Sequence, residues 1–456
     1  MAAILTTTAA IADWVAGPAI EALDADSIAL VRRAFLDTIG VSLLGARLES
    51  PRAIAVVEFE RGGGGKASVF GMGRKADLRS AALINGTSSH AELFDDNNAP
   101  MIAHPSSPLV SALLPLAQAR RSSGRAVLYA YAAGFEVNVR LGRMLNPGLY
   151  ERGWHVTRTL GLFGTTAACA RLVGLDSARI AHALGIAASM TGGLRQNFGT
   201  MTMPLHVGLT SRDAIHAVLL AERGFESDPG GMDGKYGFFR AFAEQSPPLP
   251  VFGSPFELVD SGIIFKPFPT GAPSHAAIDA ALALRERLGG QTGAAAIGQV
   301  TCFVHPWNAM TLRDVAPTDP RLARVNLSFC IAAALLYGRV SWREFNEETL
   351  ADPALQALMR RIAVKISPDL PDNGEFPAEV HVETVDGKLL RHRSDVPPGG
   401  STRRWGDAEV IAKLRDCAAA VLSSDEVDAV IDKVQRLEDL ADVNALCESL
   451  EGPPLR

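Results

Sequence analysis

The stretch Ile297–Val304 (IGQVTCFV) decides how the chain is divided, because apolar or β-branched residues alternate with smaller or polar ones along it. Alternation with a period of two is typical of a β-strand with one buried face. A second strand is predicted at Ile362–Ile366 and a hairpin with an Asp-Gly turn at 378–390. Helices are expected between these strands, at 276–288 and 322–337. The region around Ile297–Val304 is therefore predicted to be α+β.

On both sides of this region the sequence has a helical pattern, with apolar residues recurring every three or four positions. Upstream, a short strand is expected at 67–70, and helices are predicted at 27–44, 77–89, 107–119, 124–145, 160–173, 177–190 and 211–224. Helices return from about residue 407 to 450. The predicted fold is mainly α with an inserted α+β domain. The expected segments are 1–262 (helical domain, first part), 263–400 (α+β domain) and 401–456 (helical domain, C-terminal part).

The composition excludes several classes of protein. Of the 456 residues 47% are hydrophobic and 21% are charged, and the formal net charge is −6. Without a cluster of Lys and Arg we expect no nucleic-acid partner, and without a long uncharged apolar run we expect no membrane span. The five cysteines are widely spaced and odd in number, which argues against a disulfide framework and favours the cytoplasm.

Three separated stretches carry the residues that point to chemistry. The first runs from His90 (HAELFDDNN) to His104 and combines two histidines with three carboxylates, without helical or strand periodicity. The second is Gly-Trp-His ending at His155, and the third is Phe265–Pro269 (FKPFP), followed by His275. Titratable residues on irregular backbone between apolar helices are typical of active-site loops.

The order and separation of these stretches resemble the MmgE/PrpD family over almost the whole chain. The similarity begins at 33–40 (RAFLDTIG), continues through 85–90 (NGTSSH), and extends to 325–330 (VNLSFC). The resemblance implies a helical body made from both chain ends with a smaller α+β lid, and a homodimer. It also implies cofactor-free dehydratases, decarboxylases or epimerases that act on small anionic carboxylates.

The resemblance also suggests which residues act. His104 and His155 are expected to transfer protons, Asp95 to orient one of them, and Lys266 to face a substrate carboxylate. Further substrate-binding positions are expected at His275, Asn97, His90, Tyr150, Arg152, Met203 and His206. The residues alone leave three interpretations of the first stretch open: a metal site on His90, Asp95, Asp96 and His104, turn chemistry, or a metal-free site. The resemblance favours the metal-free site. For His155 the structural alternative is a buried histidine bonded to a carbonyl.

Three positions depart from the family pattern. Leu93 replaces an aspartate, Met203 a lysine and Phe329 a tyrosine. A thioether cannot replace an ammonium as a carboxylate anchor, and a phenyl ring has no proton to donate. We therefore expect a lyase of the dehydratase or decarboxylase type with an altered substrate. The alternatives are an epimerase of an amino- or imino-dicarboxylate and a non-catalytic carboxylate-binding protein.

Overall fold

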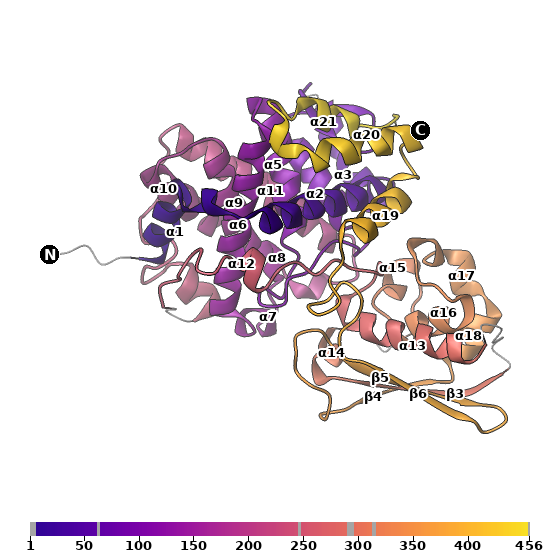
Figure 1. Ribbon diagram of the computed structural model, residues 1–456. Helices are drawn as coiled ribbons and strands as arrows, with labels where there is room; N and C mark the ends of the chain where they lie inside the picture. Colours follow the sequence, from indigo (N-terminus) through magenta and orange to yellow (C-terminus); the bar gives the residue numbers. More distant parts are fainter. Residues whose placement is uncertain (1–5, 62–63, 245–247, 290–295, 312–315, 455–456) are drawn as a thin grey trace. The chain divides into compact units, whose positions relative to one another are not determined.

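The chain folds into two compact units, which the computed structural model describes for residues 6–61, 64–244, 248–289, 296–311 and 316–454. The helical unit contains Met1–Ala91, Asp95–Ile263 and Gly406–Arg456. The α+β unit contains Ile264–Trp405 together with the short segment Glu92–Phe94. The expectation of a mainly α fold interrupted by an α+β insertion is confirmed (Figure 1).

The helical unit takes its helices from both ends of the chain. Its α-helices and its two short strands are α1 Thr7–Ala16, α2 Ala25–Gly45, α3 Glu49–Glu60, β1 Ala67–Val69, β2 Arg74–Ala76, α4 Leu78–His90, α5 Ser106–Arg120, α6 Gly124–Leu145, α7 Gly148–Glu151, α8 Val156–Thr159, α9 Gly161–Leu172, α10 Ser177–Met190, α11 Thr202–Glu222, α12 Glu257–Asp260, α19 Asp407–Ala418, α20 Ser424–Gln435 and α21 Asn444–Ser449. Within the described residues no helix is both long and apolar enough to cross a bilayer.

Helix α19 is the first helix of the C-terminal segment, and it packs along α2 near the start of the chain (Figure 1). An ion pair of 2.7 Å joins Lys413 Nζ on α19 to Asp37 Oδ1 on α2, and both side chains are almost completely buried. A buried charge is tolerated only when it is paired. This ion pair therefore fixes the position of α19 along α2. The C-terminal segment is therefore anchored in the core of the helical unit by this ion pair.

Helices α4 and α11 pack very closely because glycines face each other at their contact. A Cβ atom at Gly208 would lie 2.3 Å from the Leu83 carbonyl oxygen, and one at Gly86 would lie 2.9 Å from the Gly208 Cα. Only glycine permits this approach of two backbones. The packing matters for the site, because α4 ends at His90 and α11 carries His206.

The α+β unit packs helices against one face of a four-stranded sheet. Its elements are α13 His275–Arg287, β3 Ile297–Val304, α14 Pro306–Thr311, α15 Pro320–Ala323, α16 Leu327–Tyr337, α17 Glu347–Ala351, α18 Pro353–Met359, β4 Ile362–Ile366, β5 Ala378–Thr384 and β6 Leu389–Ser394. The strand order is β4-β3-β5-β6. Strand β3 pairs in parallel with β4 and antiparallel with β5, which also pairs antiparallel with β6.

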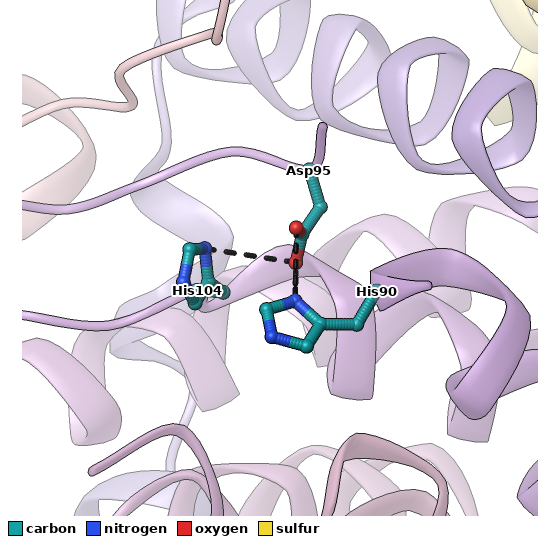
Figure 2. Close-up of side chains that lie close together, drawn as sticks. All are labelled: His90, Asp95 and His104. Carbon is teal, nitrogen blue, oxygen red and sulfur yellow. Dashed lines mark hydrogen bonds and ion pairs between the residues drawn. The ribbon is translucent and has the colours of Figure 1, made fainter. Parts of the chain in front are cut away.

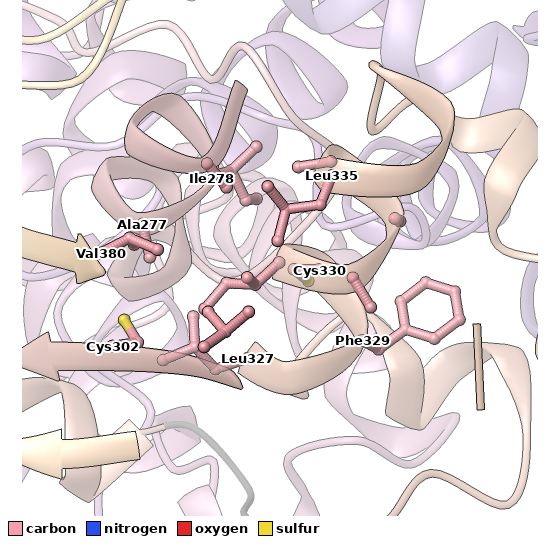
Figure 3. Packing of buried hydrophobic residues seen from close by; sticks show 14 of the residues in the cluster. Ala277, Ile278, Cys302, Leu327, Phe329, Cys330, Leu335 and Val380 are labelled. Atoms are coloured by element: carbon pink, nitrogen blue, oxygen red, sulfur yellow. The ribbon is translucent and has the colours of Figure 1, made fainter. Parts of the chain in front are cut away.

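Alternation along the strands places their apolar side chains on the face that α13 and α16 cover. Val300, Cys302 and Val304 of β3 are buried, as are Val380 and its neighbours two positions away on β5. Figure 3 shows Cys302 and Val380 in one cluster with side chains of α13 and α16, such as Ala277 and Leu327. Phe329, where the family pattern has tyrosine, is completely buried there, with its ring 5.3 Å from the ring of Phe345.

The structure differs from the sequence prediction at several elements, among them α1 and α3, which were not predicted, and three of the differences have a clear local reason. Helix α11 begins at Thr202, not at 211, because Pro204 occupies its first turn, where a missing N–H costs nothing. The single helix predicted at 322–337 is two helices, since Asn326 caps the start of α16 by accepting a hydrogen bond from Phe329 N. Strand β2 was not predicted, because Arg74–Ala76 is mostly exposed and not apolar.

Candidate functional site

His90 and Asp95 form the centre of the candidate site in the helical unit. His90 is the last residue of α4, and its Nδ1 lies 2.9 Å from both carboxylate oxygens of Asp95. Both side chains are buried, and Ser107 Oγ donates a further hydrogen bond of 2.8 Å to Asp95. A carboxylate only accepts hydrogen bonds, so His90 Nδ1 carries a proton and its ring is held in one orientation.

His104 returns to this centre because the loop after α4 folds back on itself. Asn98 and Ala103 form an isolated antiparallel bridge, and the Asn98 side chain accepts a bond of 2.9 Å from Met101 N. The His104 ring centroid then lies 4.6 Å from that of His90, and its Nδ1 is 3.6 Å from Asp95 Oδ2 (Figure 2). One carboxylate is therefore close to two imidazoles.

The tautomer of His104 is fixed by the backbone. Its Nδ1 lies 2.7 Å from the carbonyl oxygen of Asp96, which can only accept a hydrogen bond. Nδ1 therefore carries the proton, and the lone pair of a neutral His104 is at Nε2, where a base needs it. His104 is also the least buried of the site histidines, with its side chain 17% exposed against 1% for His90.

Asp96 is completely buried beside this loop and has a different environment from Asp95. It accepts hydrogen bonds from the Oγ and, at 3.2 Å, from the backbone N of Ser106, and that Oγ lies 2.6 Å from the hydroxyl of Tyr131. Burial, reinforced by the nearby charges of Asp37 and Asp95, raises the pKa of Asp96 to about 8. At neutral pH it is therefore mostly a neutral acid that fixes the loop.

His155 and His206 complete the cluster from two other helices. His155 precedes α8, with its ring centroid 5.8 Å from that of His90 and 5.0 Å from that of Phe198, which meets it edge-on. Its Nδ1 lies 3.0 Å from Nδ1 of His206 on α11. Burial lowers the pKa of His155 well below its usual value and that of His206 to about 4, so both rings are neutral at neutral pH.

The structure thus brings together five of the residues expected from the sequence: His90, Asp95, His104, His155 and His206. Asp95 makes its shortest hydrogen bonds with His90, which was expected to bind substrate, and lies 3.6 Å from His104, so its role in orienting His104 or His155 stays a prediction. The structural alternative for His155, a bond from its ring to a carbonyl, is replaced by the bond to His206. Met203 is buried three residues before His206, so both lie on one side of α11.

Three of the remaining expected residues also belong to the helical unit. Tyr150 on α7 lies under the guanidinium of Arg195, whose Cζ is 3.6 Å from its ring centroid. Arg152 donates a hydrogen bond to the Ala243 carbonyl oxygen and pairs with Glu244 at 3.0 Å. Asn97 is half-buried, and its Nδ2 has no hydrogen-bond partner among the described residues. Their roles in substrate binding stay predictions.

Lys266 and His275 belong to the α+β unit. Lys266 is buried, and its Nζ donates a hydrogen bond of 2.8 Å to the carbonyl oxygen of Leu93, in the segment that joins this unit. Leu93 has a left-handed backbone with φ of 52°. His275 begins α13 and meets the ring of Phe268 edge-on at 5.6 Å. The role of Lys266 as a carboxylate anchor and that of His275 in substrate binding stay predictions.

The group most similar to a metal site, within the described residues, is His90, Asp95 and His104, whose ligand atoms lie within 4.8 Å of one another. The Nδ1 atoms that face Asp95 both carry protons, for the reasons given above. A metal bound together with Asp95 would have to replace those N–H bonds, because imidazole binds metals through a lone pair. The observed hydrogen bonds fit acid–base chemistry without rearrangement.

Sequence reasoning missed several residues that shape this site. Ser107 and Phe198 contact Asp95 and His155, and the chain from Asp96 through Ser106 to Tyr131 fixes the loop. The polar run after His104 was a signal for the two serines. Nothing in the local pattern marks Phe198 or Tyr131, since both look like ordinary core aromatics.

Comparison with known proteins identifies the family of the chain. The MmgE/PrpD N-terminal domain matches residues 9–249, and the MmgE/PrpD C-terminal domain matches residues 268–439. Human cis-aconitate decarboxylase is 29% identical over 92% of this chain and 90% of its own length. Cis-aconitate decarboxylase of Aspergillus terreus (strain NIH 2624) is 24% identical over 98% of this chain and 96% of its own length. The 2-methylcitrate dehydratase of Salmonella typhimurium is 27% identical over 53% of each chain. With both of its domains matched, the chain belongs to the MmgE/PrpD family.

Proposed function

We propose that this protein is a lyase that removes a proton from the carbon beside a carboxylate of a small carboxylic acid. The observation that carries the proposal is the buried Asp95 carboxylate within 2.9 Å of His90 and 3.6 Å of His104. Such a proton is weakly acidic, so the enzyme needs a positioned base and a means of stabilising the charge that develops. The names of the relatives above, decarboxylase and dehydratase, support a lyase, whereas an epimerase has no support among them.

In this proposal His104 is the base, because its Nε2 lone pair is fixed by the bond from Nδ1 to Asp96 and its side chain is the most exposed of the cluster. Asp95 stabilises the imidazolium that forms on His104. His155 supplies or removes the second proton. Lys266 is proposed to hold a carboxylate of the substrate. These steps use side chains alone and call for no cofactor.

The test is proton exchange in D₂O with four acids: cis-aconitate, 2-methylcitrate, malate and citramalate. We expect NMR to show deuterium uptake beside a carboxylate of at least one acid, and a reduction of about 10²–10⁴-fold in His104→Asn. His182→Asn is the matched control, because His182 is on α10 and bonds to the backbone of Ser227. Loss of water or of CO₂ then identifies the type of lyase.

Three other results would contradict the proposal or one of its assignments. Stabilisation of the protein against heat by one of the acids, without any exchange, would favour the non-catalytic binding protein. Inversion at the exchanging carbon without loss of a group would favour the epimerase. Exchange that His104→Asn leaves unchanged would remove His104 from the mechanism.

A further inference from the structure

The hydrogen bond between His155 and His206 joins two imidazoles through the same kind of atom. Their Nδ1 atoms lie 3.0 Å apart, both side chains are buried, and the residues are 51 positions apart in the chain. A hydrogen bond needs one donor and one acceptor, so only one of the two Nδ1 atoms carries the proton. Each neutral imidazole has a single N–H, which couples the tautomer of one ring to that of the other.

Two arrangements of the pair follow from this coupling. When His155 holds the shared proton at Nδ1, its Nε2 has a lone pair and is a base. When His206 holds the shared proton, a neutral His155 carries its own proton at Nε2 and is an acid. The state of His206 therefore decides which chemistry His155 offers at Nε2.

The groups that face the pair decide how readily His206 accepts a proton, and burial together with the groups around His206 lowers its pKa. His90, His104 and Asp95 lie on the side of His155, together with the ring of Phe198. On the side of His206 the charged neighbour is Arg158, which is paired with Asp213 at 2.6 Å and donates to the carbonyl oxygen of Met190. The pairing with Asp213 reduces, but does not remove, the repulsion that Arg158 and His90 exert on a protonated His206, so the charge rests there only transiently.

We propose that His206 is a positioning and proton-relay residue that acts through His155, and that it does not bind substrate. In the step envisaged, the substrate proton bonds to Nε2 of His155 while the Nδ1 proton of His155 moves to Nδ1 of His206. The positive charge comes to rest on His206, and the electron pair of the broken C–H bond stays on the substrate. Return of the two protons reverses the step. This inference rests on the proposed function.

His206→Asn separates the relay from simple positioning. The asparagine amide can donate or accept a hydrogen bond at about the place of Nδ1, but it does not take up a proton at neutral pH. With the acid of the four-member panel that exchanges fastest, we expect kcat to fall by at least about tenfold, with KM unchanged within about threefold. The pH profile of kcat should also lose its dependence on the histidine pair.

The matched control is His216→Asn, the same substitution on the same helix, where the side chain contacts Arg79 instead of the cluster. Thermal unfolding of both variants shows whether α11 stays folded. Unchanged kcat in His206→Asn would overturn the relay, and a raised KM with unchanged kcat would assign His206 to substrate binding. His206→Phe, which removes the bond altogether, should be at least as impaired as His206→Asn.

A second measurement needs no substrate. In protein with ¹⁵N-labelled histidine, the shared proton should give a scalar coupling between the Nδ1 atoms of His155 and His206, which His206→Asn abolishes and His216→Asn retains. Absence of the coupling in the wild-type protein would overturn the relay through His206 but would leave the proposed function untouched. If the coupling is present but no acid exchanges, the proposed function fails, and with it the relay, while the shared proton stands.

Discussion

At the scale of single residues, Asp95 and Asp96 are neighbours in sequence with opposite properties. Asp95 is oriented by His90 and Ser107, whereas Asp96 is buried beside Ser106 with a pKa raised to about 8. In the unfolded chain an aspartate has a pKa of about 3.9. Between these two values the folded protein holds a proton that the unfolded chain has lost, so the free energy of unfolding decreases as the pH rises.

Asp96→Asn should therefore become more stable than the wild-type protein as the pH rises. The amide oxygen can accept the bond from Ser106 N, the NH₂ group can donate to Ser106 Oγ in place of accepting from it, and the amide cannot ionise. The difference should grow by up to about 1.4 kcal/mol per pH unit between about pH 4 and pH 8. Thermal unfolding at pH 5, 7 and 8.5 measures this difference in stability. The proton-exchange activity of Asp96→Asn is compared with that of Asp95→Asn. A variant that loses stability most strongly at pH 8.5 would contradict the assignment.

Met203 determines specificity in our interpretation. It is buried on the same side of α11 as His206, where the family pattern has lysine. A substrate carboxylate facing a thioether is left poorly paired, at a cost of about 1–3 kcal/mol. We expect slow turnover of cis-aconitate and 2-methylcitrate, and improvement by Met203→Lys, measured by steady-state kinetics. Wild-type turnover on the order of 10 s⁻¹ with either acid would refute this.

Chelation gives a separate test at the same scale. Because the Nδ1 atoms of His90 and His104 carry protons where they face Asp95, we expect EDTA treatment to leave proton exchange unchanged. Elemental analysis before and after dialysis is the companion measurement. Stoichiometric metal whose removal abolishes exchange would contradict the acid–base mechanism.

At the scale of elements, the distance between α4 and α11 sets the geometry of the site. A methyl group at Gly208 would lie 2.3 Å from the backbone oxygen of Leu83, which cannot move without shifting α4. We expect Gly208→Ala to destabilise the protein by about 1–3 kcal/mol and to reduce exchange, since His90 and His206 would separate. The matched control is Gly192→Ala, where a Cβ meets nothing within 4 Å. Denaturant unfolding measures the stability of the two variants, and proton exchange of the substrate in D₂O measures their activity. Equal stability of both variants would contradict the prediction.

Elements with strong local patterns were predictable. Strands β3 and β4 lie where the sequence placed them, because alternation reports directly on a half-buried strand. The predicted start of α11 at 211 was wrong, because the helix begins at Thr202 and its first turn accommodates Pro204. The bond between His155 and His206 was not predictable, because it depends on the packing of two helices and not on local periodicity.

At the scale of the whole molecule, the units are joined by segments that should be accessible to proteases. Residues 401–404 are exposed just before the chain re-enters the helical unit at Gly406, and they include Arg403 and Arg404. We expect brief trypsin treatment to cut there, and a less specific protease also to cut near residue 260, in agreement with boundaries proposed at 263 and 400. Mass spectrometry of the fragments maps the cuts. The double variant Arg403→Gln/Arg404→Gln, which has no trypsin site in this segment, is the control. An intact 401–404 segment in the wild-type protein would contradict the boundary.

The segment Glu92–Phe94 belongs to the α+β unit although the residues on either side belong to the helical unit. Its Glu92 carboxylate lies 2.5 Å from the guanidinium of Arg324, and both side chains are buried. A gene fragment encoding only 264–405 would omit Glu92 and leave the Arg324 charge buried and unpaired, a loss of about 3–5 kcal/mol. The α+β unit is thus not a module that recombination can transfer by exchanging one continuous stretch of DNA. Its inheritance therefore depends on three residues that lie in the loop between His90 and His104.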